Sequence, residues 1–371
     1  MSQQGTLSSH ETPQRKATPR FTEGEKSVLI FYPSRKFYQK AGSVLIQTYP
    51  QLRDPCGSGH DSWVVMIRQK FKNERRKLSS SRVTESRQKF GAAAKRPATS
   101  AEKNLTKKGK VGQKLAQDLP PCCEDLASIA AHEAWLLAEM GKPLPDIEQI
   151  RCRLELSHSS RIKQLSQIPF AAALERYPYL MDIEWFLHDF NSLIKKDGEK
   201  AIEHGFSQVM GLAVGGALGA RKKDVGPLLE VFDPAMSPRR KKHIQTVRTL
   251  CLLARLLNQP TSVEALFVPM EQDKPQTPCI IYSGSSAEEA VDMFLSVEGV
   301  KMTRVIDATQ GITAIMAAYW LFDVSYAPLT QNVCCLFEHL FLDITVTKPK
   351  CVVQRFIATQ KMAVFPAAMD V

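Results

Sequence analysis

The residues best suited to a chemical task fall on one side of a short helix expected at residues 62–78. At about 100° of rotation per residue, the stretch that follows Trp63 separates into an apolar face and a basic face. The basic face carries cations that neutralise phosphates, together with amide and guanidinium groups that bond base edges. Its members are Arg68, Gln69, Lys72, Asn73, Arg75 and Arg76. This combination predicts a surface that binds nucleic acid, with DNA as the first expectation.

The opposite side of the same helix is expected to be its packing face. Met66, Ile67, Phe71 and Leu78 all lie within roughly 80° of Trp63 on the helical wheel. A small helical unit that buries such a stripe against one or two other helices leaves its basic face free to enter a major groove. The apolar stripe therefore predicts how the basic residues are positioned.

Two other interpretations of the basic residues stay open. The runs KNERRK (72–77) and AKRP (94–97) would serve as a nuclear address without any nucleic-acid contact. A basic helix face or linker can also simply face water, with no partner. In either case the alternative function is that of a protein-interaction or scaffold protein, which would use the helical middle and the C-terminal part of the chain.

One segment accounts for the net positive charge of the chain. Residues 66–114 hold 16 lysines and arginines and three glutamates, a net charge of +13. The formal net charge of all 371 residues is +11, so the remainder of the chain sums to −2. Such a block is typical of a polyanion-binding protein or of a nuclear address. We expect a nuclear protein, with the cytoplasm as the alternative.

None of the familiar catalytic or metal-binding motifs that we compared with the sequence matches it in full. HEAWL (132–136) begins like a zinc-protease helix, but Leu136 occupies the position of the second histidine ligand. Cys56 and His60 lie close together, yet no second pair at zinc-ligand spacing follows. The glycine-rich run 211–223 lacks the Gly-Lys-Ser/Thr ending of a P-loop. We therefore expect a protein that is not an enzyme, with no cofactor, no metal and no small-molecule substrate.

One group of titratable residues surrounds Trp185. Asp182, Glu184 and His188 fall near it on a single expected helix. Carboxylates and a histidine on the surface of a helix are more often solvated than catalytic, so this group is expected to face water.

Neither a membrane span nor a disulfide framework is expected. The longest apolar run, residues 209–220, is shorter than the roughly 18 residues that a span requires. The nine cysteines include two adjacent pairs and no CxxC motif, and no signal peptide opens the chain. These features favour reduced thiols inside the cell.

Composition and periodicity predict a mainly helical protein with a small α+β unit near its C-terminus. The expected organisation is a disordered segment (1–24), a small helical basic module (25–78), a flexible basic linker (79–121), a helical domain (122–277), an α+β unit (278–345) and a C-terminal tail (346–371).

Local signals within the α+β unit are specific. The run PCIIYSG (278–284) is apolar and bounded by Pro and Gly, which predicts a buried strand. Two further strands are expected around a tight turn at Glu298–Gly299, although Glu is an unusual first residue for such a turn. The segments 308–324 and 331–344 are predicted to be helices.

Three segments resemble the fish proteins labelled sterile alpha motif domain-containing protein 3-like. The first is 48–78, where the shared positions are Tyr49, Pro50, Leu52, Asp54, Gly57, Gly59, Trp63, Lys70, Phe71, Lys72, Asn73, Arg75, Arg76 and Lys77. The others are 176–198 and 278–328, and together the three cover about half of the chain. The resemblance implies a recurring architecture and no particular activity. The compact five-helix motif that names the family has no recognisable counterpart in this chain, so the roles of that motif are not expected here.

Overall fold

The computed structural model describes residues 33, 35–54, 57–77 and 111–364, except for the side chains of residues 75–77 and 361–364. The expectations for 1–24 and for most of the 79–121 linker lie outside the described residues. The chain divides into two compact units. The first comprises Met1–Val44 and Trp63–Ala98, and the second comprises Leu45–Ser62 and Thr99–Val371.

Aromatic contacts between two helices hold the described part of the first unit together. Helix α2 spans Arg35–Thr48, and helix α3 spans Asp61–Lys77. The Phe71 ring of α3 packs edge-on against Tyr38 and Phe37 of α2, with ring centroids 5.7 and 6.3 Å apart. Edge-to-face aromatic pairs at such distances stabilise a contact beyond the area that they bury. A second helix thus covers the apolar stripe of α3 at Phe71.

Asp54, in the loop before α3, caps the start of this helix. Its carboxylate accepts the backbone N–H of Ser62 at 2.7 Å and also the Ser62 hydroxyl. Asp61 is the first residue of the helix. The Asp54 bonds satisfy one of the backbone donors that every helix leaves free at its N-terminus.

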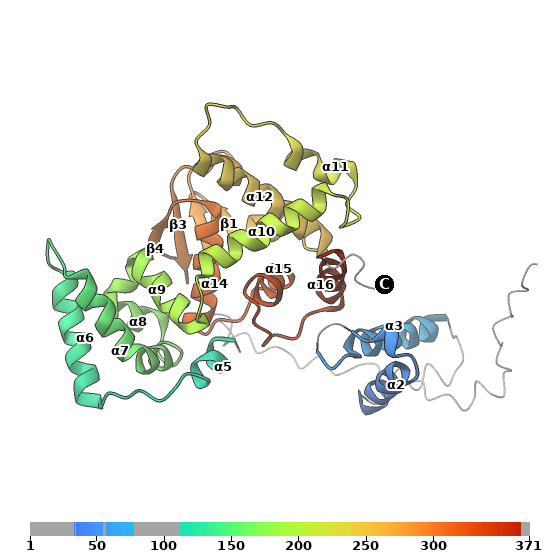
Figure 1. Ribbon diagram of the computed structural model, residues 1–371, viewed down its shortest axis with the longest axis horizontal. Helices are drawn as coiled ribbons and strands as arrows, with labels where there is room; N and C mark the ends of the chain where they lie inside the picture. Colours follow the sequence, from blue (N-terminus) through green and yellow to red (C-terminus); the bar gives the residue numbers. More distant parts are fainter. Residues whose placement is uncertain (1–32, 34, 55–56, 78–110, 365–371) are drawn as a thin grey trace, which may run out of the picture. The chain divides into compact units, whose positions relative to one another are not determined.

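A set of helices forms most of the described part of the second unit (Figure 1). Their bounds are α5 Val111–Gln117, α6 Leu126–Met140, α7 Ile147–Leu165, α8 Phe170–Arg176, η2 Pro178–Met181, α9 Ile183–Ile194, α10 Gly198–Val214, α11 Lys222–Val225, η3 Gly226–Leu229, α12 Pro238–Leu256 and α13 Ser262–Leu266. Short polar residues fix many of the starts, because the side chains of Asp125, Asp146, Asp182, Asp197 and Ser237 each accept a first-turn N–H.

A four-stranded sheet lies against these helices. Its strands are β1 (Phe267–Pro269), β2 (Cys279–Tyr282), β3 (Met293–Val297) and β4 (Val300–Val305), in the order β1-β2-β3-β4. The β1–β2 pair is parallel, and the other two pairs are antiparallel. Glu298 and Gly299 join β3 to β4 with φ values of 51° and 78°, so the expected tight turn has positive φ at both positions. The expected strand at β2 and the expected hairpin are confirmed.

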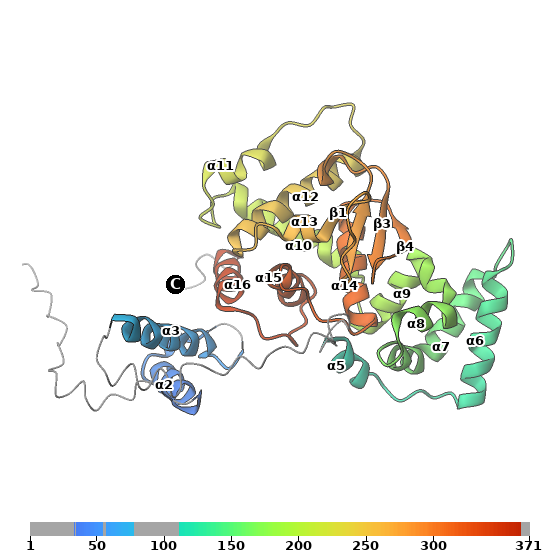
Figure 2. The same cartoon turned by 180° about the vertical axis from the view of Figure 1, so that it is seen from behind.

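Helix α14 (Ala308–Leu321) is the centre of the second unit. It packs against β2, β3 and β4, and it also contacts α9, α10 and α12. All of its residues except Gln310 are buried. Figure 1 shows α14 beside the sheet, and Figure 2 shows from behind that α13 lies next to β1. A helix that is apolar on every side is typical of such a core position.

The C-terminal part of the described chain is helical. It comprises α15 (Gln331–Leu336), a π-helical turn η5 (Phe337–Phe341) and α16 (Cys351–Val364). Helix α16 occupies a segment that we expected to be a tail, and its Val353 and Ile357 are buried.

The expected mainly helical fold with a small sheet toward the C-terminus is confirmed, but its boundaries differ from the expectation. Helix α5 falls inside the expected linker and is bonded to the core, since the Gln113 N–H donates to Asp323 Oδ1 at 3.0 Å. Strand β1 falls inside the expected helical domain. One hydrophobic core continues from Val111 to Ile357, so no boundary between two cores lies at residues 277–278.

Candidate functional site

The basic face of α3 is exposed in the part that the structure describes. Arg68, Gln69, Lys72 and Asn73 are all exposed, and Lys70 is exposed beside them. The Gln69 side-chain amide donates to the Asn73 side-chain oxygen at 3.2 Å, one helical turn away. These two amides therefore lie next to each other along a row of cations, where they can bond a ligand together.

Arg75 and Arg76 lie in the last turn of α3, but their side chains are outside the described residues. Four of the six candidate residues are thus placed on one exposed helix face. How the other two side chains lie stays a prediction.

The packing face predicted for α3 is confirmed in part. Trp63, Ile67 and Phe71 are half-buried, at a spacing of four residues. Met66 was expected to face the core, but it is 41% exposed. Leu78 lies outside the described residues. The half-buried stripe is therefore narrower than expected.

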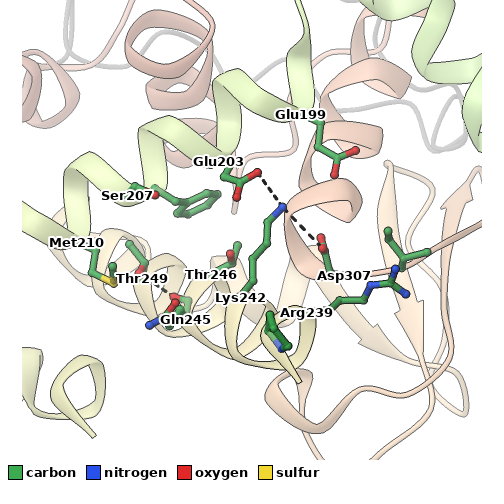
Figure 3. Close-up of a pocket in the computed structure, with 13 residues that line it drawn as sticks. Glu199, Glu203, Ser207, Met210, Arg239, Lys242, Gln245, Thr246, Thr249 and Asp307 are labelled. Carbon is green, nitrogen blue, oxygen red and sulfur yellow. Dashed lines mark hydrogen bonds and ion pairs between the residues drawn. The ribbon is translucent and has the colours of Figure 1, made fainter. Parts of the chain in front are cut away.

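A polar pocket lies between α10 and α12, in the second unit (Figure 3). Its volume is about 520 Å³. It is closed at one end by Ile306 and Asp307, where β4 leads into α14. Lys242 stands in the middle of the pocket, with its ammonium 2.8 Å from a Glu203 oxygen and 3.9 Å from an Asp307 oxygen.

The charges in this pocket shift one another's ionisation. Burial alone would lower the pKa of Lys242, but the hydrogen bond to Glu203 and the Asp307 charge raise it above its usual value. Burial raises the pKa of Glu199 above its usual value, and the Asp307 charge raises it further. The hydrogen bond from Gln310 acts in the opposite direction and lowers the pKa. Lys242 therefore stays a cation and is poorly suited to act as a nucleophile.

His243, the residue after Lys242, links helix α12 to Ala287 and to the first residue of α14, Ala308, by hydrogen bonds. Its Nδ1 accepts the Ala308 N–H at 3.1 Å, and its Nε2 lies 2.8 Å from the Ala287 carbonyl oxygen. An N–H donor at Nδ1 and a carbonyl at Nε2 require the neutral ring with its proton on Nε2. Burial lowers the pKa of His243, which agrees with this state.

An apolar groove of about 620 Å³ lies on another part of the second unit. It runs between the α6–α7 connection and the start of α9, and large apolar side chains form most of its wall. Leu137, Ile147 and Met181 are 57%, 42% and 41% exposed there. Among the described residues that line it, Asp182 and Glu184 carry the charges, and both are acidic. Exposed apolar surface gathered in one hollow is typical of a binding site.

The titratable residues expected to be solvated around Trp185 prove to be divided between two environments. Asp182 caps α9 by accepting the Glu184 N–H at 2.8 Å. The ring of His188 is largely covered, and its Nδ1 lies 4.0 Å from an oxygen of Asp189. Asp189, which the sequence did not single out, is fully buried and forms an ion pair with the equally buried Arg161.

The buried Arg161–Asp189 ion pair is connected to the groove through Tyr179. Burial alone would raise the pKa of Asp189, but the Arg161 charge and nearby hydrogen bonds hold it well below its usual range. The Tyr179 hydroxyl donates to Asp189 at 3.3 Å, and Tyr179 also lines the groove. This network therefore positions one wall of the groove and has no evident reactive group.

Cys335, Glu338 and His339 form a group whose donor atoms are close enough to consider a metal ion. One Glu338 oxygen already accepts the N–H groups of Val346 and Thr347, at 2.9 and 2.5 Å. The Nε2 of His339 lies 2.6 Å from the Thr347 carbonyl oxygen. These bonds hold the chain after η5 in place, which is a sufficient role for Glu338 and His339.

Comparisons with known proteins give a distant relationship. No protein-family model matches the chain, and no solved structure matches it. The chain is similar to the human protein named sterile alpha motif domain-containing protein 3, with 23% identity over 320 residues. The match covers 84% of this chain and 59% of the human protein, so the chain spans less than two thirds of that relative. This similarity supports a loose family relationship.

Among the described residues, no helix combines the length and apolarity needed to cross a membrane.

Proposed function

We propose that this chain is a non-enzymatic nuclear protein that binds nucleic acid, DNA in the first place, through the exposed basic face of α3 and the basic segment that follows it. The observation that carries the proposal is the division of α3 into a half-buried apolar row and an exposed polar row. The apolar row is Trp63, Ile67 and Phe71, and the exposed row is Arg68, Gln69, Lys72 and Asn73. Cations there neutralise phosphates, and neighbouring amides can bond base edges.

Charge supports the same proposal. Because residues 66–114 hold a net charge of +13 while the rest of the chain sums to −2, a polyanion is attracted to this segment and to no other part of the chain as strongly. The exposed Lys70 adds a further cation beside the named residues.

The test is a binding assay with the full chain and a fluorescent DNA duplex or single strand. The variant Arg68→Glu, Lys72→Glu, Arg75→Glu, Arg76→Glu should lose at least 100-fold in affinity at low salt, on the order of what four phosphate contacts contribute. A matched control, Lys200→Glu, Arg221→Glu, Lys222→Glu, Lys223→Glu, makes the same change in net charge on the second unit. Equal losses in both variants would mean that only overall charge matters and would contradict a site on α3.

The apolar groove favours a second candidate function, that of a protein-interaction or scaffold protein. We infer that its partner is a peptide segment with large apolar side chains and flanking lysine or arginine residues. The apolar walls would take the former, and Asp182 and Glu184, the charged residues of the described lining, would attract the latter. In this case the basic segment serves only as a nuclear address.

A designed amphipathic peptide of leucine and lysine tests this second candidate. The full chain should bind it, and binding should weaken at least tenfold in the variant Ile147→Lys, Met181→Lys. Val231→Lys, Val291→Lys is the matched control, because these side chains are 96% and 73% exposed and do not line the groove. Binding that survives the groove variant would place the peptide elsewhere and contradict the candidate.

A further inference from the structure

The polar pocket between α10 and α12 has two chemically different ends. Glu199, Glu203, Arg239, Lys242 and Asp307 gather at the end nearest α14 (Figure 3). Along the two helices the lining becomes uncharged, ending at Met210 of α10 and Thr249 of α12. The pocket therefore offers charged groups to one end of a ligand and a neutral surface to the other.

The charges at the first end are unevenly paired. Lys242 lies between Glu203 and Asp307 and engages both. Glu199 is half-buried and has no cation in contact among the described residues; its hydrogen bond is to the neutral Gln310 side chain, at 3.3 Å. Arg239 is exposed, and within the described residues its guanidinium has no carboxylate partner. Lys242 attracts Glu199 without contacting it. Among the described residues, one anion and one cation of the same pocket thus have no opposite charge in direct contact.

A simple ion would satisfy only half of this arrangement. A lone anion attracted to Arg239 would face the carboxylates of Glu199, Glu203 and Asp307, and like charges at short range are unfavourable. A lone amine attracted to Glu199 would leave Arg239 unpaired. A molecule that carries both charges meets each with its opposite.

We propose that this pocket binds a small zwitterion of the α-amino acid type. Its ammonium group would contact Glu199, its carboxylate would contact Arg239, and its uncharged side chain would extend toward Met210 and Thr249. A volume of about 520 Å³ suits a molecule of this size, since ordinary ligand sites fall in the range of roughly 300–1,000 Å³. This inference is independent of the function proposed for α3.

Isothermal titration calorimetry of the full chain tests the proposal with chosen probes. The panel consists of L-leucine, L-methionine, L-glutamine and L-phenylalanine. Isoamylamine and isocaproate are the matched probes for leucine, because each lacks one of its two charged groups. We expect at least one amino acid of the panel to bind with a dissociation constant below about 1 mM, which corresponds to roughly −4 kcal/mol. We expect both single-charge leucine analogues to bind more weakly than leucine, at least tenfold where leucine is the ligand.

Variants separate a defined site from general charge. Glu199→Gln and Arg239→Gln should each weaken binding at least tenfold, with the far-UV circular dichroism unchanged. Lys241→Gln is the control, because Lys241 neighbours Lys242 on α12 without lining the pocket. The proposal is overturned if no amino acid of the panel binds, or if leucine binds and isoamylamine binds as tightly. It is also overturned if Lys241→Gln has the same effect as Arg239→Gln.

Discussion

Replacing Asp189 by asparagine should destabilise the second unit more than neutralising an exposed charged residue does. Asp189 and Arg161 are both fully buried, and Asp189 receives bonds from Nη2 and Nε of Arg161 and from the Tyr179 hydroxyl. Asparagine keeps the shape of the side chain but leaves the Arg161 charge without a counter-ion. Removing one partner of a buried ion pair typically costs about 3–5 kcal/mol.

The assay is thermal and urea-induced unfolding of the full chain, followed by circular dichroism. For a unit of this size, each kcal/mol lowers the midpoint by about 2–4 °C, so a fall of roughly 10 °C is expected. Glu148→Gln is the matched control, because Glu148 forms an exposed pair with Arg151 and such pairs contribute little. A loss below about 1 kcal/mol in Asp189→Asn would refute the reasoning, since this is the range of an exposed pair.

The same residue gives a pH dependence with a definite sign. Because the pKa of Asp189 in the folded chain is well below its unfolded value of about 3.9, its stabilising effect is complete above that value. It is lost as the pH falls below about 3.9 toward the folded pKa. The difference in unfolding free energy between wild type and Asp189→Asn should therefore be constant near neutrality and shrink at acid pH.

Three further predictions concern other parts of the fold. Gly112→Ala should lower the free energy of unfolding by about 1–3 kcal/mol and increase hydrogen exchange in α5, because a Cβ there would lie 1.9 Å from the Trp320 carbonyl oxygen. The control Gly211→Ala should be neutral or stabilising, because a Cβ there would meet no atom within 4 Å. Equal effects of the two substitutions would contradict the contact between α5 and Trp320. Glu298→Asn should raise the unfolding midpoint, because asparagine tolerates the observed φ of 51° better; a lower midpoint would contradict this turn geometry. Since burial lowers the pKa of His243, stability should fall as the pH drops below about 6.5, and a fall of the same size in His243→Gln would contradict that assignment.

Features with strong local signals were predictable from the sequence. The β3–β4 hairpin follows from a glycine in a two-residue connection between two apolar runs, and the structure has positive φ at both turn positions. Helix α14 follows from a long apolar segment, and its cap, Asp307, accepts the Gln310 N–H at 2.9 Å. Within α3, the row Trp63, Ile67 and Phe71 follows from helical periodicity.

Features that depend on distant partners were not predictable. Strand β1 has three residues and exists because it pairs in parallel with β2, which no local pattern indicates. Helix α5 lies in a Lys- and Gly-rich sequence, and its position depends on a close approach to Trp320 in α14. Composition alone therefore suggested a linker where tertiary contacts hold a helix.

The candidate sites divide in the same way. The α3 basic face lies within one helix, so its membership could be worked out from spacing alone. The polar pocket takes Glu199 from α10, Lys242 from α12 and Asp307 from the start of α14, which are brought together by the fold. The sequence signal that was available was the basic run 239–242 at the start of α12, an unfavourable place for cations unless carboxylates lie nearby.

The salt dependence of DNA binding tests the central proposal most directly. Binding of a fluorescent duplex to the full chain should weaken linearly with salt on a double-logarithmic plot. The slope should become shallower by about 3–4 in the variant that reverses Arg68, Lys72, Arg75 and Arg76, at about 0.9 per lost phosphate contact. The control that reverses Lys200, Arg221, Lys222 and Lys223 should keep the wild-type slope. No binding by the wild type at low salt, or an unchanged slope in the α3 variant, would contradict the proposal that this helix face contacts nucleic acid.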